Sequence, residues 1–207
     1  MARPVVTAAD IEALPAGGEV IVPRGAVVTD QARELARERG VQIRVEESVD
    51  APSSSRHRPV VVAADHAGYD LKEHLKRFLL EAGYEVRDLG TDSTQAVDYP
   101  DFAAAAAQAV ASGAAWRGIV VDGAGIGSAM AANKIPGARA ALCYDATTER
   151  NSREHNDANI LTLGARMLTA DAAREIVRLW LETEFAGGRH QRRIDKIVAL
   201  ERRGQGR

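Results

Sequence analysis

The sequence predicts an α/β protein, in which helices cover both faces of a parallel five-stranded sheet, with a small appendage at the N-terminus. Two observations carry this prediction. From Val60 onward, short apolar runs of strand length alternate with segments whose apolar residues recur at helical spacing. Before that point, a stretch rich in Ser and Pro at 51–59 sets off a separate pattern of strands and a helix. Strands that alternate with helices pair in parallel, so we expect a sheet with two covered faces.

Five apolar runs are expected to form the strands of the sheet: 60–64, 84–86, 118–121, 139–143 and 160–163. In a parallel sheet, ligands bind beyond the carboxyl ends of the strands. Polar or glycine-rich residues directly follow four of these runs, at 65–66, 122–128, 144–145 and 164–166. We therefore expect these residues to gather at one edge of the sheet.

The segments between and after the strands have the spacing of amphipathic helices. The expected helices are one with leucines at 71, 75 and 79 that ends at Gly83, an alanine-rich one at 102–110, one capped by Thr169 that carries Ile176 and Trp180, and a last one around Ile194 and Ile197.

Residues 1–46 are expected to form a small separate module. The pattern predicts a strand at 19–22, a turn at 23–25, a helix at 30–39 that starts at Thr29 and stops at Gly40, and a strand at 41–45. Residues 47–58 are interpreted as a linker. The sequence shows no evident internal repeat.

Composition excludes several classes of protein. The net charge of −2 over 207 residues argues against general nucleic-acid binding, which needs a basic surface. The chain has no apolar run long enough to span a bilayer and no signal-peptide pattern at its start. Its single cysteine, Cys143, excludes an internal disulfide and fits a reducing compartment. We expect a cytosolic protein that binds neither nucleic acid nor membrane.

The most informative segment is the glycine-rich loop at 122–128, which follows an apolar run and precedes small residues of helical character. Gly123, Gly125 and Gly127 let backbone N–H groups converge on one point, because no Cβ blocks them. Such a loop before a helix suits an anion. Asp122 stands at its start, where a carboxylate can exchange a proton with the ligand. The spacing also fits a dinucleotide pyrophosphate, although the pattern alone is weak support.

Six motifs appear together along the chain: Ala-Asp-His-Ala-Gly at 64–68, Asp-Tyr-Pro at 98–100, Gly-Ala-Gly-Ile-Gly at 123–127, Ala-Asn-Lys at 132–134, Glu-His-Asn-Asp at 154–157, and Gly-Gly-Arg-His-Gln at 187–191 followed by Arg193. In this order and spacing, the chain resembles the ribose-5-phosphate isomerase type B family and its sugar-phosphate isomerase relatives over about residues 59–203. The resemblance implies a Rossmann-like domain that works as a dimer or tetramer, with active sites shared across the dimer interface. It also implies that no metal or nucleotide cofactor takes part.

The resemblance further implies roles for single residues. Aldose–ketose isomerisation moves a proton between adjacent carbons through an enediolate, and it needs acid/base groups, an anion hole and phosphate ligands. The implied phosphate ligands are Arg189 and Arg193, and further phosphate or sugar contacts are implied for His66, His190 and Arg166. The N–H groups of Gly123, Gly125, Gly127 and Ser128 are implied to bind the enediolate. Asp65 and His155 are implied to handle the sugar and open its ring, and Asn156 to contact a hydroxyl. Arg189 and Arg193 share a helix face if the helix begins that early.

The chain departs from the family at three positions of the loop. One branch of the family has a cysteine base at the position of Asp122, and another has a glutamate base at the position of Ser128. Family members usually have Ser or Thr where this chain has Ala124. Asp122 is then the replacement base expected in this loop. The alternative is that its carboxylate caps the helix or accepts hydrogen bonds at the strand end.

Three hypotheses about function follow. The first is an isomerase that interconverts ribose 5-phosphate and ribulose 5-phosphate. The second is the same reaction on a tetrose or hexose phosphate. The third is a catalytically weak subunit of a hetero-oligomer that binds sugar phosphate.

The segment at 23–40 resembles short segments of enzymes associated with bacterial microcompartments. That resemblance implies a targeting or assembly role for the N-terminal module, with shell or core proteins as partners.

Overall fold

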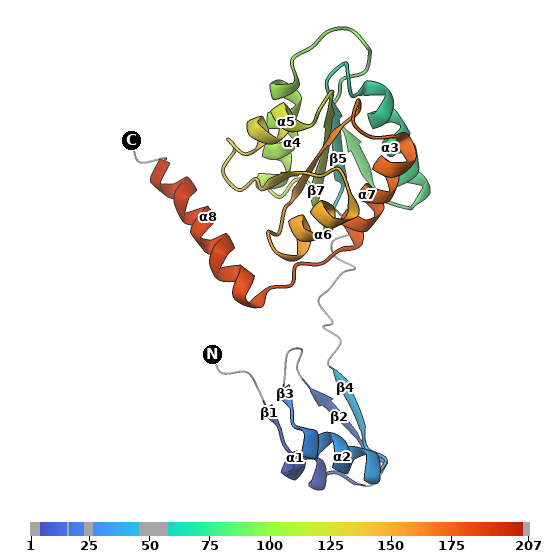
Figure 1. Ribbon diagram of the computed structural model, residues 1–207, viewed down its shortest axis with the longest axis vertical. Coiled ribbons are helices and arrows are strands. Elements are labelled where there is room, and N and C mark those ends of the chain that lie inside the picture. The colour runs from blue at the N-terminus through green and yellow to red at the C-terminus, as the bar shows by residue number, and fades with distance from the viewer. Residues whose placement is uncertain (1–4, 16, 23–26, 46–57, 205–207) are drawn as a thin grey trace. The chain divides into compact units, whose positions relative to one another are not determined.

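The computed structural model describes residues 5–15, 17–22, 27–45 and 58–204. It divides the chain into two compact units, residues 1–52 and 53–207 (Figure 1). The second unit contains a five-stranded parallel sheet, which confirms the predicted fold class. Across the sheet the strands follow the order β6 (Val86–Asp88), β5 (Val60–Ala64), β7 (Arg117–Asp122), β9 (Ile160–Gly164) and β8 (Ala140–Leu142).

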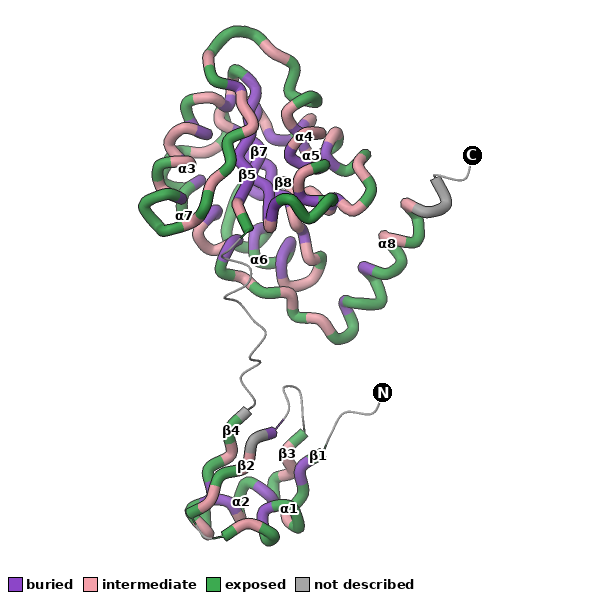
Figure 2. The backbone as a smooth tube through the Cα atoms, turned by 180° about the vertical axis from the view of Figure 1, so that it is seen from behind, coloured by how far each residue is buried: buried purple, intermediate pink, exposed green. Residues whose placement is uncertain are grey.

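The three central strands are buried along their whole length, as their continuous apolar runs predict (Figure 2). Residue Ala64 of β5 pairs with Val121 of β7, and Val121 pairs with Leu163 of β9. The chain passes from β5 outward to β6 and then returns to β7 on the other side of β5. The point between β5 and β7 is therefore the topological switch point, where doubly wound sheets bind ligands.

Two pairs of helices cover the sheet. Helices α3 (Tyr69–Glu81) and α7 (Ala170–Glu182) pack on one face through leucines of α3 and through Trp180. Helices α4 (Tyr99–Ala111) and α5 (Ile126–Ala132) pack on the other face through small residues. The Thr169 side chain accepts a hydrogen bond from the N–H of Ala172, which confirms the predicted cap of α7.

The second unit also contains helix α6 (Ala146–Glu154), which follows β8, and two helical segments that follow α7. The 3₁₀ helix η1 (Gly188–His190) leads directly into α8 (Gln191–Gly204). Helix α8 runs away from the sheet instead of packing along it (Figure 1). None of the helices in the described part of the chain is both long enough and apolar enough to cross a bilayer.

Two elements begin two or more residues away from their predicted starts, whereas the limits of the others differ by at most one residue where a range was predicted for both ends. The strand predicted at 84–86 forms at Val86–Asp88, because Gly83 adopts a left-handed φ of +83° and the chain straightens only after it. Helix α4 begins at Tyr99, three residues before the predicted start, since Pro100 is well tolerated in a first turn.

The N-terminal unit is built from six short elements: β1 (Val5–Val6), α1 (Ala8–Glu12), β2 (Glu19–Val22), β3 (Val27–Val28), α2 (Asp30–Glu38) and β4 (Gln42–Val45). They form two parallel two-stranded sheets, β1 with β3 and β2 with β4. The strand at 19–22, the helix after Thr29 and the strand within 41–45 match the prediction. The predicted turn at 23–25 and residues 47–57 of the predicted linker lie outside the described residues.

The expectation that the chain has no internal repeat is wrong for this unit. The unit β1-α1-β2 corresponds to β3-α2-β4, with Val5 paired to Val27 and Glu19 paired to Gln42. Each half places Val-Val-Thr before its helix and a glycine of positive φ before its second strand, Gly17 and Gly40. The two halves share few other residues, so the correspondence is clearer in the pairing of the strands than in the sequence.

Candidate active site

The structure places the predicted site residues in two groups at opposite edges of the sheet. The carboxyl-edge group consists of Asp65, His66, Asp122, Gly123, Gly125, Gly127, Ser128 and Arg166. The amino-edge group consists of His155, Asn156, Arg189, His190 and Arg193. The groups separate because α6 starts after the carboxyl end of β8 and returns to the start of β9, which brings its C-terminal residue to the amino edge (Figure 1).

The carboxyl-edge group surrounds the glycine loop after β7. Gly125 has a φ of +79°, and a Cβ there would lie 2.4 Å from Cδ1 of Leu142. A Cβ on Gly127 would lie 2.5 Å from the ring of Tyr99. The loop is thus packed tightly between β8, β9 and the start of α4, which only glycine at these positions allows.

Asp122 directs its carboxylate into this loop. Its Oδ1 accepts hydrogen bonds from the N–H groups of Ala124, at 2.7 Å, and of Gly125. Its Oδ2 accepts from the N–H of Ser128 at 2.9 Å and from the Ser128 hydroxyl at 2.5 Å. The side chain is only 4% exposed. This is the arrangement of a strand-end acceptor that organises the loop.

Asp65 and His66 follow the neighbouring strand, β5. The Oδ1 atom of Asp65 accepts hydrogen bonds from the N–H groups of Ala67 and Gly68, both at 2.9 Å. Asp65 is buried, whereas His66 is exposed, and the His66 Nδ1 lies 3.1 Å from the carbonyl oxygen of Val97. Gly68 lies against β7, since a Cβ there would be 2.2 Å from the Val121 carbonyl oxygen. The two strand ends are therefore in direct contact.

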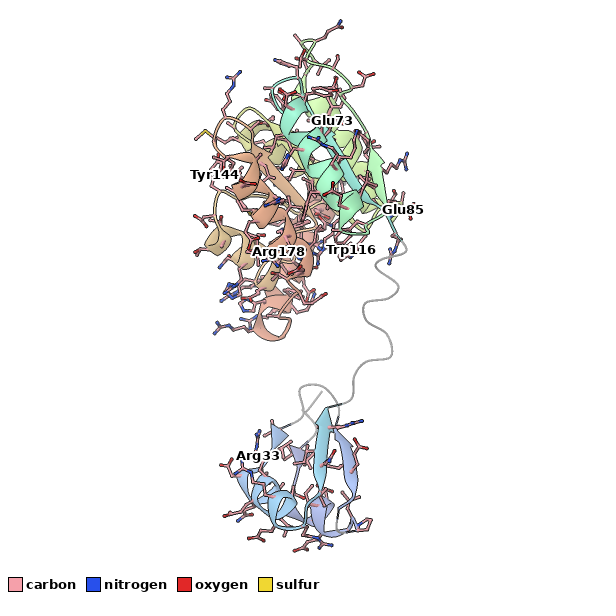
Figure 3. All side chains as sticks on the ribbon, turned by 90° about the vertical axis from the view of Figure 1, so that its right-hand side faces the viewer. Arg33, Glu73, Glu85, Trp116, Tyr144 and Arg178 are labelled. Carbon is pink, nitrogen blue, oxygen red and sulfur yellow. The ribbon has the colours of Figure 1, made fainter. Side chains whose placement is uncertain are left out.

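Tyr144 and Arg166 complete this edge. The hydroxyl of Tyr144 (labelled in Figure 3) donates a 2.7 Å hydrogen bond to the carbonyl oxygen of Ala124. Arg166 is exposed, and its backbone N–H donates to the carbonyl oxygen of Gly123. Its guanidinium Nε lies 3.7 Å from the point where a Cβ of Gly123 would stand. Arg166 is thus a cation beside the first glycine of the loop.

A pair of stacked imidazoles forms the centre of the amino-edge group. The rings of His155 and His190 lie 4.3 Å apart and nearly parallel. The Nδ1 of His155 pairs with the side-chain amide of Asn151 at 2.9 Å. His190 is 7% exposed, and its Nδ1 has no partner among the described residues. Burial, with His155 and nearby arginines adding to it, lowers the pKa of His190, so this ring is held neutral.

Asn156, Arg189 and Arg193 lie at the surface of the same edge. The side-chain amide of Asn156 donates to the backbone and side-chain oxygens of Asn151, both at 3.0 Å. Arg189 lies in η1, and α8 begins only at Gln191, so the two arginines do not share one face of a single α-helix. In the described part of the chain, neither arginine forms an ion pair with a carboxylate.

Two buried arginines hold the segment that leads to His190. Arg117 donates to the carbonyl oxygens of Trp180, Leu181 and Thr183 at the end of α7. Burial, together with nearby Arg153, lowers the pKa of Arg117 to about 9. Arg153 also donates to the Thr183 carbonyl oxygen. Both guanidinium groups lie over the ring of Trp180, and that of Arg117 also lies over Trp116. These contacts fix where the chain leaves α7.

Sequence reasoning gave no role to three residues that support this site. Tyr144 supports the glycine loop, Tyr99 covers Gly127, and Asn151 orients the His155 ring. Asn151 lies four residues before His155, which is the spacing of side-chain neighbours on a helix, so that signal was present in the sequence. The described residues contain no group of three or more His, Cys, Asp or Glu side chains placed to hold a metal ion.

Comparison with known proteins identifies the family. The model of the ribose/galactose isomerase family matches residues 60–197. Ribose-5-phosphate isomerase B of Escherichia coli is 41% identical over 146 residues, which cover 70% of this chain and 98% of that protein. D-erythrulose-4-phosphate isomerase of Pectobacterium atrosepticum is 38% identical over 143 residues, 69% of this chain and 94% of that protein.

A solved structure agrees with this match. Ribose-5-phosphate isomerase B of Clostridium thermocellum superposes with a TM-score of 0.70 and 50% identity, over 70% of this chain and 99% of that one. These matches cover the second unit nearly completely and leave the N-terminal unit outside. The chain therefore belongs to the ribose/galactose isomerase family.

Proposed function

We propose that this protein is a cofactor-independent aldose–ketose isomerase of a phosphorylated sugar, and that its substrate pair is ribose 5-phosphate and ribulose 5-phosphate. The observation that carries the proposal is the glycine loop at the switch point between β5 and β7, flanked by two carboxylates, in a chain of this family. The similarity to ribose-5-phosphate isomerases B favours a five-carbon sugar.

Each group of residues supplies one requirement of the reaction. Arg189 and Arg193, which we call the phosphate clamp, are exposed cations that attract the phosphate dianion. The backbone N–H groups of the glycine loop stabilise the enediolate oxygen. His155, held by Asn151, exchanges a proton with the ring oxygen, and Asn156 contacts a sugar hydroxyl. Proton transfer at carbon falls to a carboxylate at the loop.

The complete active site is formed between two copies of the chain. In one copy the glycine loop and the phosphate clamp lie at opposite edges of the sheet, so a single small sugar cannot reach both. Helix α8 presents Ile197 and Leu200, which are 41% and 63% exposed, toward a cavity of about 820 Å³ beside β8 and α6. A two-fold dimer brings the loop of one copy to the clamp of the other.

The N-terminal unit serves targeting or assembly, within a bacterial microcompartment. Its core residues, which include Ile11, Val22 and Ala36, form a cluster of their own, apart from the two clusters that cover the sheet. The family match begins only at residue 60, which supports a catalytic unit that works without this module.

A second candidate is the same reaction on a four-carbon sugar. The similarity to the D-erythrulose-4-phosphate isomerase favours it. The weak-subunit alternative draws support from Asp122, whose carboxylate faces its own loop and not the space where a sugar would bind.

The deciding experiment is a coupled isomerase assay of the purified full chain with four-, five- and six-carbon aldose phosphates. We expect the highest kcat/KM with ribose 5-phosphate. A higher value with the tetrose phosphate would move the substrate assignment to the second candidate. Binding by calorimetry without turnover of any of the three would reject the isomerase and leave the weak subunit.

Mixing two inactive variants tests the shared site. Asp65→Asn impairs the carboxyl edge, and a double Ala variant of Arg189 and Arg193 impairs the amino edge. After exchange of subunits, a mixed dimer has one site with both changes and one with neither, so random mixing restores roughly a quarter of the wild-type activity. No recovery, in samples shown to exchange subunits, would place each whole site within one chain.

A further inference from the structure

Two carboxylates end neighbouring strands at the switch point, and the structure holds them differently. Ala64 and Val121 are paired across β5 and β7, and Asp65 and Asp122 each come one residue later. Adjacent strands lie about 4.8 Å apart, and equivalent positions point to the same face of a sheet. The two carboxylates therefore stand side by side at the place where the substrate is expected to bind.

The carboxylate of Asp122 is saturated. An ionised carboxylate offers about four acceptor positions. Asp122 uses two on Oδ1, for the N–H groups of Ala124 and Gly125, and two on Oδ2, for the N–H and hydroxyl of Ser128. A proton can bind this group only by displacing one of these donors, because both the carboxylate and Ser128 are buried.

The carboxylate of Asp65 is fixed on one side and open on the other. Its Oδ1 accepts from the N–H groups of Ala67 and Gly68, which sets the orientation of the side chain. Its Oδ2 accepts no hydrogen bond from any described residue, and it does not appear among the buried atoms without a partner. One oxygen of Asp65 is thus oriented, has no donor among the described residues and is not fully buried.

We infer that Asp65 is the catalytic base at carbon and that Asp122 is a positioning residue, an internal anion that holds the glycine loop in shape. This inference rests on the proposed isomerase function. Asp65 Oδ2 takes the proton from C2 of the open-chain aldose as the C2–H bond breaks and an O–H bond forms. The electron pair becomes the C1=C2 double bond, and the C1 carbonyl oxygen becomes the enediolate oxyanion. Asp65 returns the proton to C1, and the proton of the C2 hydroxyl moves to the C1 oxyanion. The C1 oxygen becomes a hydroxyl as the C2 ketone forms, so no oxidant or reductant is needed.

The experiment compares matched variants of the full chain with ribose 5-phosphate in D₂O, where NMR follows exchange of the carbon-bound proton. Asp65→Asn keeps the shape of the side chain and removes its basicity. Asp70→Asn makes the same change at an exposed carboxylate in the first turn of α3 and serves as the control. Asp122→Asn replaces one acceptor oxygen by an amide N–H₂, which cannot accept the hydrogen bonds that the loop donates. Ser128→Ala removes one of the four hydrogen bonds to Asp122.

For Asp65→Asn we expect kcat and proton exchange at saturating substrate to fall by roughly 10²–10⁴-fold, the usual contribution of a positioned base, with KM and Tm unchanged. For Asp122→Asn we expect a higher KM and a lower Tm, with exchange at saturation retained within about tenfold, because the variant loosens the loop and keeps the base. Ser128→Ala should show the same pattern more weakly, and Asp70→Asn should match the wild type.

Exchange at the wild-type rate in Asp65→Asn would overturn the inference. So would an Asp122→Asn variant that loses exchange as completely as expected for Asp65→Asn while its KM and Tm stay unchanged. Failure of the proposed function looks different, because the wild type itself would then exchange no proton with any sugar phosphate. In that case the proposed role of Asp65 is rejected together with the isomerase function. The Tm values of Asp122→Asn and Ser128→Ala then decide whether Asp122 holds the loop in shape.

Discussion

Arg189 and Arg193 have their positive charges free for a ligand, since neither forms an ion pair in the described chain. Each hydrogen bond from a charged group to phosphate contributes roughly 1.5–3 kcal/mol. We expect Arg189→Ala and Arg193→Ala each to weaken the binding of a sugar phosphate by about tenfold or more, as calorimetry measures.

Arg192→Ala is the matched control for these two variants, because Arg192 is an exposed arginine in the same segment and is outside the phosphate clamp. Its affinity should remain that of the wild type. Equal losses in all three variants would mean that the segment contributes only a general positive field, and unchanged affinity in both clamp variants would remove them from the site.

At the residue scale, sequence reasoning identified the loop but not how its carboxylate is used. The spacing of Gly123, Gly125 and Gly127 predicted a place where N–H groups converge. The direction of the Asp122 side chain depends on the left-handed turn at Gly125 and on the start of α5 at Ile126, which together aim donors back at the strand end. A pattern of residue types does not contain that information, because it does not determine the backbone dihedral angles at Gly125 and Ile126.

At the scale of elements, helix α6 contains a buried carboxylic acid, the side chain of Glu149. Glu149 is fully buried, with one oxygen accepting from the Thr183 hydroxyl at 3.2 Å and the other without a partner among the described residues. Burial raises the pKa of Glu149 above its ordinary value. The native state then binds this proton more tightly than the unfolded state, so the stability it contributes is present at low pH and is lost as pH rises through the folded pKa.

Glu149→Gln should therefore raise Tm at pH 7 to 8, with a gain of about 2–4 °C for each kcal/mol removed, and the difference from wild type should shrink toward pH 4. Thermal unfolding across this range compares the wild type with Glu149→Gln under the same conditions, so the contributions of other titrating groups cancel in the difference between their Tm values. Glu184→Gln, at an exposed glutamate beyond α7, is the control and should change little. A lower Tm at pH 8 for Glu149→Gln would show that the ionised carboxylate is stabilised in the fold.

The accuracy of the element prediction follows from burial. Strands β5 and β9 begin at the predicted residues. A central strand of a sheet covered on both faces is buried on both sides, so the limits of its continuous apolar run mark the limits of the strand. The two-residue strands β1 and β3 were missed, since two valines are too few to show any periodicity. Strand β6 was placed two residues early because it lies at the sheet edge, where burial does not mark its limits.

For the whole molecule, the two units have separate cores and the family match excludes the first. Deleting residues 1–57 should leave the Tm of the catalytic unit and its kcat/KM within about twofold of the full chain, while localisation or assembly changes. The measurements are thermal unfolding, the isomerase assay and the position of fluorescent fusions in cells with microcompartments. An insoluble truncated chain would show that the catalytic unit depends on the module.

The division of the site between two edges could not be read from the sequence of one chain. The motifs around Asp65 and Asp122 and those around His155 and Arg189 appear as one continuous series along the sequence. Only the antiparallel course of α6 and α7 relative to the strands separates them, and that course is a property of the doubly wound topology.

The repeat in the N-terminal unit has a consequence for how its two halves associate. Both strand pairs join one half to the other, β1 to β3 and β2 to β4. A peptide with one half alone would leave both of its strands unpaired, and it would find equivalent partners only in a second copy of itself. The unit is thus organised like a homodimer whose two halves belong to one polypeptide. Because the association of the halves is intramolecular, it does not depend on protein concentration, whereas two separate peptides would dissociate on dilution.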